Sequence, residues 1–301
     1  MHASCDDPFV ARRNEAVTDV IAWFADNRRD LPWRAPDVTP WGILVSEFML
    51  QQTQVERVVP KWLAWMQVWP TPAALAKAPA AEVLRAWQGL GYPRRALRLH
   101  AAAQIIVEQW DGQVPSSETD LRALPGVGSY TSAAIAAFAF AQPALVLDTN
   151  IRRVIMRAWG GRAAAPAHQT RAEVELATSL VTAATGAKWA AAVMELGAVV
   201  CTARAPRCEQ CPISASCTWL ADGKPANGPA RRAQPVFTGS DRQARGALLR
   251  AVSSASPASQ SAIEAAWADE VQRERAMTSL IGDGLVIRAR EGYVLPGDEC
   301  R

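Results

Sequence analysis

The sequence lacks the features that mark several other protein classes. No apolar run in its 301 residues is long enough to cross a membrane, which takes about 20 residues. The first residues, MHASCDDPFVARRNEA, contain no apolar segment like that of a secretory signal peptide. Strand patterns are nearly absent before LVIRAREGYVLPG at the end, and no internal repeat stands out. We therefore expect an all-α, unsecreted protein that works in the cytoplasm and binds no membrane.

Lysine is scarce, because only four of the 32 basic residues are lysines and the rest are arginines. The net charge of +3 makes the chain mildly basic, which permits a polyanionic partner without requiring one. Half of the residues are apolar, so a chain of this length can bury a sizeable core. We expect two or three domains.

Cysteine is also rare and unevenly distributed. Two of the six cysteines, Cys5 and Cys300, lie near the ends, and the others are spaced C-x6-C-x2-C-x5-C at Cys201, Cys208, Cys211 and Cys217. In a reducing cell such a cluster is more often a metal site than a disulfide framework. Four thiolates suit tetrahedral zinc or a [4Fe–4S] cluster. A single C-x2-C pair is unlike the two knuckles of most structural zinc sites, so the spacing favours iron–sulfur without deciding it.

A glycine-containing turn joins two helical segments in the middle of the chain. The stretch LPGVGSYT follows a segment with a weak capping signature at Ser117 and Asp120, and it precedes TSAAIAAFAFAQ. Gly126 and Gly128 permit positive φ, so that backbone N–H groups and the positive end of the next helix can face outward together. Such a cradle fits the phosphate of a nucleic-acid backbone, whatever the base sequence. Taken alone, the turn fits an ordinary helical corner equally well.

Two carboxylates favour a catalytic role. Glu47 lies in WGILVSEFML, which is apolar almost all round, and no cation stands three or four residues away. We expect it to be buried with a raised pKa, as suits a general acid. Asp148 precedes TNIRRVIMRAW at an expected helix start, which favours its ionised form. Carboxyls whose pKa values differ in this way suggest an acid and a charge stabiliser. The structural alternatives are a hydrogen-bonded core residue at Glu47 and, favoured by spacing alone, a simple N-cap at Asp148.

Seven motifs occur in order between residues 30 and 218. They are LPWR (31–34), SEFMLQQTQV (46–55), GLGY (89–92), LPGVGSYT (124–131), LDTN (147–150), MELGAVVC (194–201) and the cysteine cluster. Together they closely resemble the MutY-type adenine DNA glycosylases of the helix-hairpin-helix superfamily. The resemblance implies two α-helical lobes with DNA in the cleft, a [4Fe–4S] cluster on the four cysteines, and a DNA-gripping hairpin at LPGVGSYT.

We expect the chain to divide into five parts. The resemblance implies an N-terminal helix packing with the cluster lobe (1–30), a helical barrel lobe (31–147) with the helix-hairpin-helix (about 117–138) and an iron–sulfur cluster lobe (148–220). Beyond the resemblance, a stretch rich in proline, glycine and arginine indicates a linker (221–240), and a C-terminal module (241–301) follows it. The module shows three helical segments and a two-strand hairpin, which resemble a winged helix. Relatives typically carry a larger Nudix-like domain here that inspects 8-oxoguanine, so we expect a weaker preference for that lesion.

The resemblance assigns roles to single residues. Glu47 would protonate adenine N7 and later activate water, and Asp148 would stabilise the oxocarbenium-like sugar, with Asn150 and Tyr130 supporting both. The remaining matched positions would surround the flipped adenine (Trp33, Arg34, Leu50 and Val55), probe the duplex (Gln51, Gln52 and Tyr92) and contact the DNA backbone (Gly126, Val127 and Gly128).

We therefore expect a monomeric, nucleoid-associated bacterial enzyme that removes adenine paired with 8-oxoguanine or guanine in double-stranded DNA, without cutting the strand. Two positions depart from the family: Thr149 replaces the usual glycine, as in the endonuclease III branch, and Pro93 replaces a common second tyrosine. The alternatives are an endonuclease III-like glycosylase and lyase for oxidised pyrimidines, and a non-catalytic, redox-sensing iron–sulfur protein. Tyr130, where the lyase branch has lysine, argues against the first, and the pair Glu47 and Asp148 argues against the second.

Overall fold

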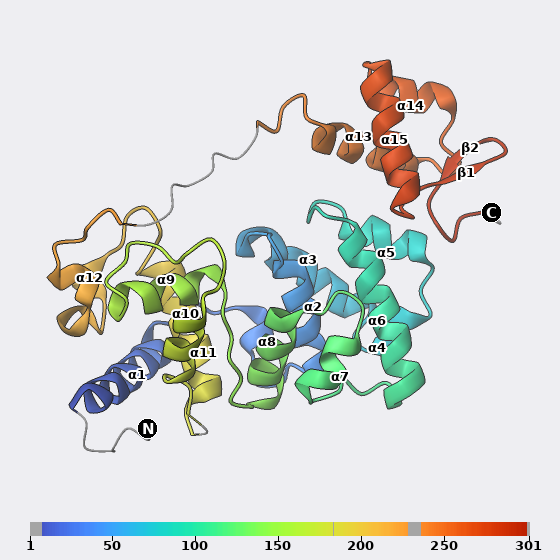
Figure 1. Cartoon of the computed structure of the whole chain (residues 1–301). Helices are drawn as coiled ribbons and strands as arrows, with labels where there is room; N and C mark the ends of the chain where they lie inside the picture. Colours follow the sequence, from blue (N-terminus) through green and yellow to red (C-terminus); the bar gives the residue numbers. More distant parts are fainter. Residues whose placement is uncertain (1–7, 183, 228–235, 300–301) are drawn as a thin grey trace. The chain divides into compact units, whose positions relative to one another are not determined.

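The computed structural model describes residues 8–182, 184–227 and 236–299, so Cys5 and Cys300 lie outside the described residues. Helices make up nearly all of the regular structure in these ranges (Figure 1), which confirms the predicted all-α class. None of the described helices is both long enough and apolar enough to span a membrane. The chain forms two compact units, whose described residues fall in Met1–Arg34, Ser116–Arg122 and Val127–Arg232 for the first and in Ala35–Pro115, Ala123–Gly126 and Ala233–Arg301 for the second.

The first unit is organised around one central helix. Its elements are α1 (Pro8–Asn27), η1 (Pro32–Arg34), most of α7 (Glu118–Ala123), α8 (Ser129–Phe140), α9 (Thr149–Ala158), α10 (Arg171–Thr178), α11 (Gly186–Val199), η2 (Cys208–Gln210), η3 (Ser214–Ser216) and α12 (Thr218–Ala221). Helices α1, α8 and α9 all pack on α11, and α10 and α12 pack on α9. A glycine allows the closest approach, because a Cβ atom on Gly197 of α11 would lie 2.8 Å from the backbone oxygen of Asn150.

The second unit combines an N-terminal group of helices with the C-terminal module. Its elements are α2 (Pro40–Leu50), α3 (Val55–Val68), α4 (Pro72–Ala76), α5 (Ala80–Trp87), α6 (Arg94–Trp110), α13 (Asp241–Ser254), α14 (Gln260–Ala266), α15 (Glu270–Gly282), β1 (Ile287–Ala289) and β2 (Gly292–Val294). Tryptophans fill part of its core: the Trp65 ring meets Trp69 and Trp87 edge-on, with centroids 4.6 and 5.6 Å apart. Such edge-on pairs add to the stabilisation that burial provides.

Local sequence explains where the site-bearing helix α2 begins. The Thr39 hydroxyl caps the helix by accepting a hydrogen bond from the Gly42 N–H at 3.4 Å. Pro40 follows at the first helical position, where the missing N–H costs nothing. Eight of the next residues are buried, so the helix runs through the interior of its unit. The stretch WGILVSEFML, which is apolar almost all round, thus forms a buried helix.

Helix α10 is short. It ends at Thr178, where the Thr178 and Ser179 hydroxyls donate to the carbonyls of Val174 and Leu176. Hydroxyl side chains that bond to nearby carbonyls in this way favour helix ends over helix interiors. The capping signature before α7 is half formed: Ser117 caps the Asp120 N–H at 3.1 Å, and its hydroxyl donates to the Asp120 carboxylate at 2.6 Å.

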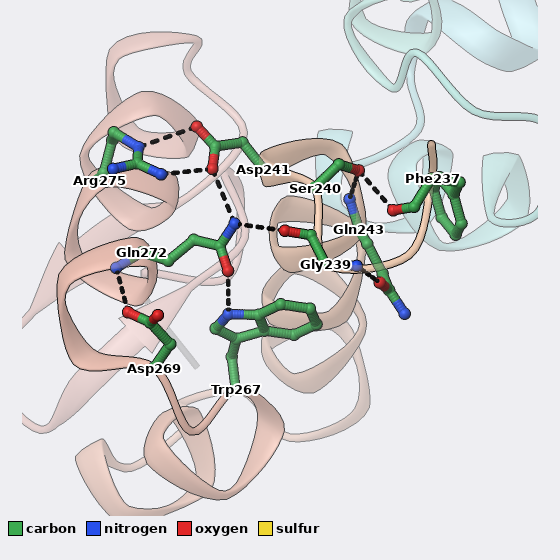
Figure 2. Close-up of polar contacts among 9 residues, drawn as sticks. All are labelled: Phe237, Gly239, Ser240, Asp241, Gln243, Trp267, Asp269, Gln272 and Arg275. Atoms are coloured by element: carbon green, nitrogen blue, oxygen red, sulfur yellow. Dashed lines mark hydrogen bonds and ion pairs between the residues drawn. The ribbon is translucent and has the colours of Figure 1, made fainter. Parts of the chain in front are cut away.

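The C-terminal module has the predicted three helices and antiparallel hairpin, in which Ile287 pairs with Val294. Its likeness to a winged helix and the five-part division of the chain stay predictions. Inside the module, the carboxylate of Asp241 at the start of α13 contacts side chains of α15 (Figure 2). It accepts two hydrogen bonds from Arg275, at 2.8 and 2.6 Å, and one from Gln272 at 2.9 Å. The Gln272 side chain in turn accepts from the Trp267 indole at 2.8 Å and donates to the Gly239 carbonyl.

The module packs on α5 of the same unit through one arginine. The Arg85 guanidinium donates to the Ser253 carbonyl at 3.1 Å and forms an ion pair with Asp298, whose side chain is 1 % exposed. A second bridge links Arg94 and Arg245 to the two carboxylate oxygens of Asp283, at 3.1 and 2.7 Å. Because Asp298 is buried, its charge depends on Arg85 for compensation.

We expect Arg85→Ala to loosen this packing strongly, because it removes the arginine of an ion pair whose carboxylate is buried, at a cost of about 3 kcal/mol. Arg275→Ala is the matched control, since its ion pair with Asp241 is exposed and worth little. Thermal unfolding and hydrogen exchange of residues 80–87 measure both effects. Equal, small changes in the two variants would show that Arg85 does not hold the module.

Candidate active site and iron–sulfur centre

Asp148 lies at the N-cap of α9 in the first unit, where a helix start was predicted. One carboxylate oxygen accepts from the Ile151 N–H at 2.6 Å, and the other accepts from the Asn150 side-chain amide at 2.7 Å. Burial raises the pKa of Asp148, and the hydrogen bonds from Ile151 and Asn150 and the charge of Arg153 only partly oppose it. The hydrogen bond at the helix start favours ionisation of Asp148 as expected, but the loss of water has the larger effect, so the net pKa shift is upward.

Arg153 connects Asp148 to the region of the first cysteine. Its guanidinium donates to the Asn150 side-chain oxygen at 2.8 Å, to the Gly197 carbonyl at 2.6 Å and to the Cys201 carbonyl at 2.7 Å. The arginine thereby occupies the oxygen of the Asn150 amide and leaves its NH₂ group to face Asp148. Sequence reasoning missed Arg153, although its spacing of three residues from Asn150 on a helix is the signal that could have found it.

The four predicted metal-ligating cysteines come together. They line one apolar pocket with Arg157, Trp219 and Leu220, among others. Arg157 donates to the Cys201 sulfur at 3.4 Å and to the Thr202 carbonyl at 2.8 Å, and its guanidinium lies 4.4 Å from the centre of the Trp219 ring. The Cys217 thiol donates to the Arg157 carbonyl at 3.6 Å. Arg157 thus ties α9 to both ends of the cysteine segment.

The chemistry of this pocket fits an iron–sulfur cluster. Burial, together with the neighbouring cysteines, raises the pKa of the Cys211 thiol to about 12. Burial raises the pKa of Cys217 as well. Four thiolates in such a place need a cationic group among them, and coordinating metal ions deprotonate thiols by supplying that charge. The sulfur-only donor set and the apolar lining match the requirements of a [4Fe–4S] cluster.

Arg34, predicted at the adenine wall, is held by a carboxylate that sequence reasoning missed. Glu195 of α11 is fully buried and accepts hydrogen bonds from Arg34 at 2.9 Å and from the backbone and side chain of Arg29. Burial acts to raise the pKa of Glu195, but the two arginines outweigh it and lower the pKa to about 2. The Arg34 guanidinium also lies 5.3 Å from the centre of the Phe24 ring. Beside it, Trp33 is buried in η1, so both predicted wall residues of this unit have fixed positions.

The second unit carries Glu47 and the predicted probe residues. Glu47 is 5 % exposed on α2, which confirms its predicted burial. Gln51 and Gln52 follow the end of this helix, and Gln52 and Tyr92 are exposed residues with left-handed φ of 57° and 47°. Leu50 and Val55, predicted at the adenine wall, are both half-buried. The Gln51 amide donates to the Gly126 carbonyl at 3.4 Å and so connects the α2 end to the glycine turn.

The two glycines of the turn have different conformations. Gly126 has the predicted positive φ, 85°, and a Cβ atom there would lie 2.8 Å from the Phe48 ring. Gly128 is extended, with φ of −95°, and is the N-cap of α8 without a side-chain cap, so of the two glycines only Gly126 adopts the positive φ that glycine permits. Space at Gly128 is open, since a Cβ atom would meet nothing within 4 Å. Gly128 therefore places no side chain at the start of α8, as an anion-binding site there requires. Val127, between the two glycines, is buried.

Within the first unit the structure brings Asp148 and Asn150 together, and within the second it joins Gln51 to Gly126. Tyr130 is half-buried in the first turn of α8, in the same unit as Asp148, whereas Glu47 belongs to the second unit.

Comparison with known proteins defines the class. Residues 45–179 match the HhH-GPD superfamily of base excision DNA repair proteins, and residues 201–217 match the iron-sulfur binding domain of endonuclease III. The fold resembles a thermostable thymine-DNA glycosylase, with a TM-score of 0.64 and 28 % identity over 72 % of this chain and 100 % of that one. It also resembles endonuclease III from a non-covalent complex with DNA, with a TM-score of 0.61 and 21 % identity over 71 % and 97 % of the two chains. The protein is thus a helix-hairpin-helix base-excision glycosylase with a [4Fe–4S] cofactor.

More similar relatives define the family. The chain is 48 % identical to an adenine DNA glycosylase of Mycobacterium tuberculosis (strain H37Rv), over 95 % of both proteins, and 49 % identical to that of Mycolicibacterium smegmatis, over 93 % and 96 %. A human adenine DNA glycosylase is 41 % identical over 66 % of this chain and 38 % of the human protein. The chain belongs to the adenine DNA glycosylase family.

We expect Arg153→Gln to slow base excision by about tenfold or more, because it releases the Asn150 amide that orients Asp148. Arg171→Gln, at an exposed ion pair on α10, is the control and should change little. Single-turnover excision rates, with iron content measured on the same preparations, check the prediction. Normal excision by the Arg153 variant at full iron content would show that this link does not support Asp148.

Proposed function

We propose that the protein removes adenine from duplex DNA where adenine is paired with 8-oxoguanine or guanine, by hydrolysing the N-glycosidic bond. The observation that carries this proposal is Asp148, held at the N-cap of α9 by Asn150, in a chain that matches adenine DNA glycosylases over nearly its whole length. The substrate is double-stranded DNA bound by a monomer, and the adenine leaves the base stack before reaction.

Glu47 and Asp148 divide the chemistry. Glu47, buried on α2, protonates adenine N7 and makes the base a better leaving group, and later takes a proton from the attacking water. Asp148 stabilises the positive charge that develops on the sugar as the bond breaks. Asn150 orients the Asp148 carboxylate through its amide, and Tyr130 supports the same site.

Fixed surfaces receive the flipped base and hold the duplex. Trp33 and Arg34 form one wall, and the anchoring of Arg34 by Glu195 means that this wall is in place before DNA binds. Leu50 and Val55 also contact the flipped adenine. Gln51, Gln52 and Tyr92 occupy the space that the adenine leaves, while the backbone at Gly126, Val127 and Gly128 contacts phosphate.

A thymine-directed activity is the second candidate, because the fold is 28 % identical to a thymine-DNA glycosylase. An oxidised-pyrimidine activity is the third, since the cysteine segment matches the iron-sulfur domain of endonuclease III. Both differ from the proposed function in the base that is released, so a set of duplexes distinguishes them.

We expect excision of adenine opposite 8-oxoguanine and opposite guanine, but little release from A:T, T:G or thymine glycol duplexes, when each is incubated with excess enzyme. Glu47→Gln should abolish excision and leave duplex affinity nearly unchanged, because it removes a proton donor without removing a contact. Glu264→Gln, on the exposed face of α14, is the matched control. Release of thymine in preference to adenine would refute the proposal, and an active Glu47→Gln variant would remove Glu47 from the mechanism.

The proposal includes a monofunctional reaction, and Tyr130 supports this part. A lyase forms a Schiff base between an amine and the sugar, and a phenol cannot form an imine. We therefore expect an intact strand after adenine release, with cleavage only on alkali treatment. Tyr130→Lys supplies the missing amine, so borohydride should trap more of this variant on DNA than of the unmodified protein. Efficient trapping of the unmodified protein would contradict the monofunctional mechanism.

A further inference from the structure

One buried arginine, Arg95, joins the two loops that carry the proposed probe residues. It stands in the first turn of α6 and is only 6 % exposed. Its Nη1 atom donates to three carbonyls at the C-terminal end of α2. Its Nη2 atom donates to two carbonyls in the loop after α5 and to the hydroxyl of Thr53, which follows α2. The six acceptors are Phe48 O (2.9 Å), Met49 O (3.1 Å), Gln51 O (2.5 Å), Leu90 O (3.1 Å), Gly91 O (2.9 Å) and Thr53 Oγ1 (2.9 Å).

These contacts surround the residues with the least favourable backbone conformations in the two loops. Gln52 and Tyr92 are left-handed, with φ of 57° and 47°, and neither is a glycine. Left-handed conformations of such residues are unfavourable unless their surroundings enforce them. Arg95 binds the carbonyls immediately before both residues, those of Gln51 and Gly91. It therefore fixes the peptide planes from which the two exposed side chains project.

The surroundings of Arg95 are unusual for a buried cation. Its six acceptors are neutral oxygens, and its guanidinium lies 5.2 Å from the centre of the Trp87 ring and 5.6 Å from that of Tyr92. Burial lowers the pKa of Arg95 to about 10, which leaves it charged at neutral pH. Carbonyl dipoles compensate this charge, and they do so only while both loops keep their positions.

We propose that Arg95 is a positioning residue for base flipping: it holds Gln52 and Tyr92 ready to enter the duplex as adenine leaves. The inference rests on the proposed function, since flipping is required for excision. A residue that only stabilised the fold would affect every substrate equally. A residue that preforms the probe loops matters most where the base must be extracted from a stack, because unstacking costs least for a base that is already unpaired.

Arg95→Lys is the variant that tests this proposal. Lysine keeps the charge but replaces the planar fork with a single ammonium group, whose three donors cannot reach six acceptors on two loops. Arg94→Lys is the matched control on the same helix, because the Arg94 side chain is 55 % exposed. Thr53→Val is a milder second variant, since the Thr53 hydroxyl accepts from Arg95 and donates to the Leu90 carbonyl at 3.0 Å.

The experiment compares two substrates under single-turnover conditions with iron-replete protein. One is a full duplex with adenine opposite 8-oxoguanine, and the other places the same pair in a bubble of unpaired bases. We expect Arg95→Lys to lose on the order of tenfold to a hundredfold on the duplex and to recover most of that loss on the bubble. Thr53→Val should show the same pattern with a smaller loss, and it decides the question if Arg95→Lys does not fold.

A second measurement follows flipping without excision. Fluorescence of 2-aminopurine, placed at the adenine position, should rise more slowly with Arg95→Lys than with unmodified protein or with Arg94→Lys. Equal losses on duplex and bubble, or an unchanged fluorescence rate, would overturn the positioning role. If the unmodified protein excises no adenine, the proposed function fails, and the fluorescence rates still decide whether Arg95 controls flipping.

Discussion

The start of α9 is the constraint on which the first unit depends. Asp148 caps the helix, Asn150 orients the cap, and Arg153 and Arg157 on later turns reach the Cys201 carbonyl and the Cys201 sulfur. One helix thus carries both the candidate catalytic carboxylate and the supports of the cysteine pocket.

In the second unit, a buried arginine, Arg95, supports the loops that carry the proposed probe residues. The proposed probe residues Gln52 and Tyr92 have left-handed backbone conformations, and Arg95 donates hydrogen bonds to the carbonyls immediately before them. Rigid support of this kind reduces the entropy that must be lost when DNA binds. In both units, the candidate functional groups lie on loops and helix ends. In both, an arginine supports these segments by donating hydrogen bonds to carbonyl and amide oxygens.

Short sequence patterns predicted the features of the candidate site that depend on neighbouring residues in the chain. The burial of Glu47, the cap at Asp148 and the cysteine grouping follow from periodicity, capping chemistry and spacing. The partnership of Arg29 and Arg34 with Glu195 could not be found in this way, because Glu195 lies more than 160 positions away and no short pattern relates them. Asp148 shows the opposite limit: the helix end was read correctly from the sequence, but the pKa depends on burial, which only the folded chain decides.

Two carboxylates of the first unit, Glu195 and Asp148, have pKa values shifted in opposite directions. Glu195 accepts hydrogen bonds from two arginines, which lower its pKa to about 2, so it is ionised at neutral pH and has a structural role. Asp148 accepts hydrogen bonds from the Ile151 backbone amide and the Asn150 side-chain amide. Arg153 bonds to the oxygen of the same Asn150 amide. Burial raises the pKa of Asp148. Because the folded pKa is raised, ionising Asp148 lowers the stability of the free protein as the pH rises through that pKa. In the proposed mechanism, a positive charge developing on the sugar relieves this cost, so the site would favour the transition state more than the free enzyme.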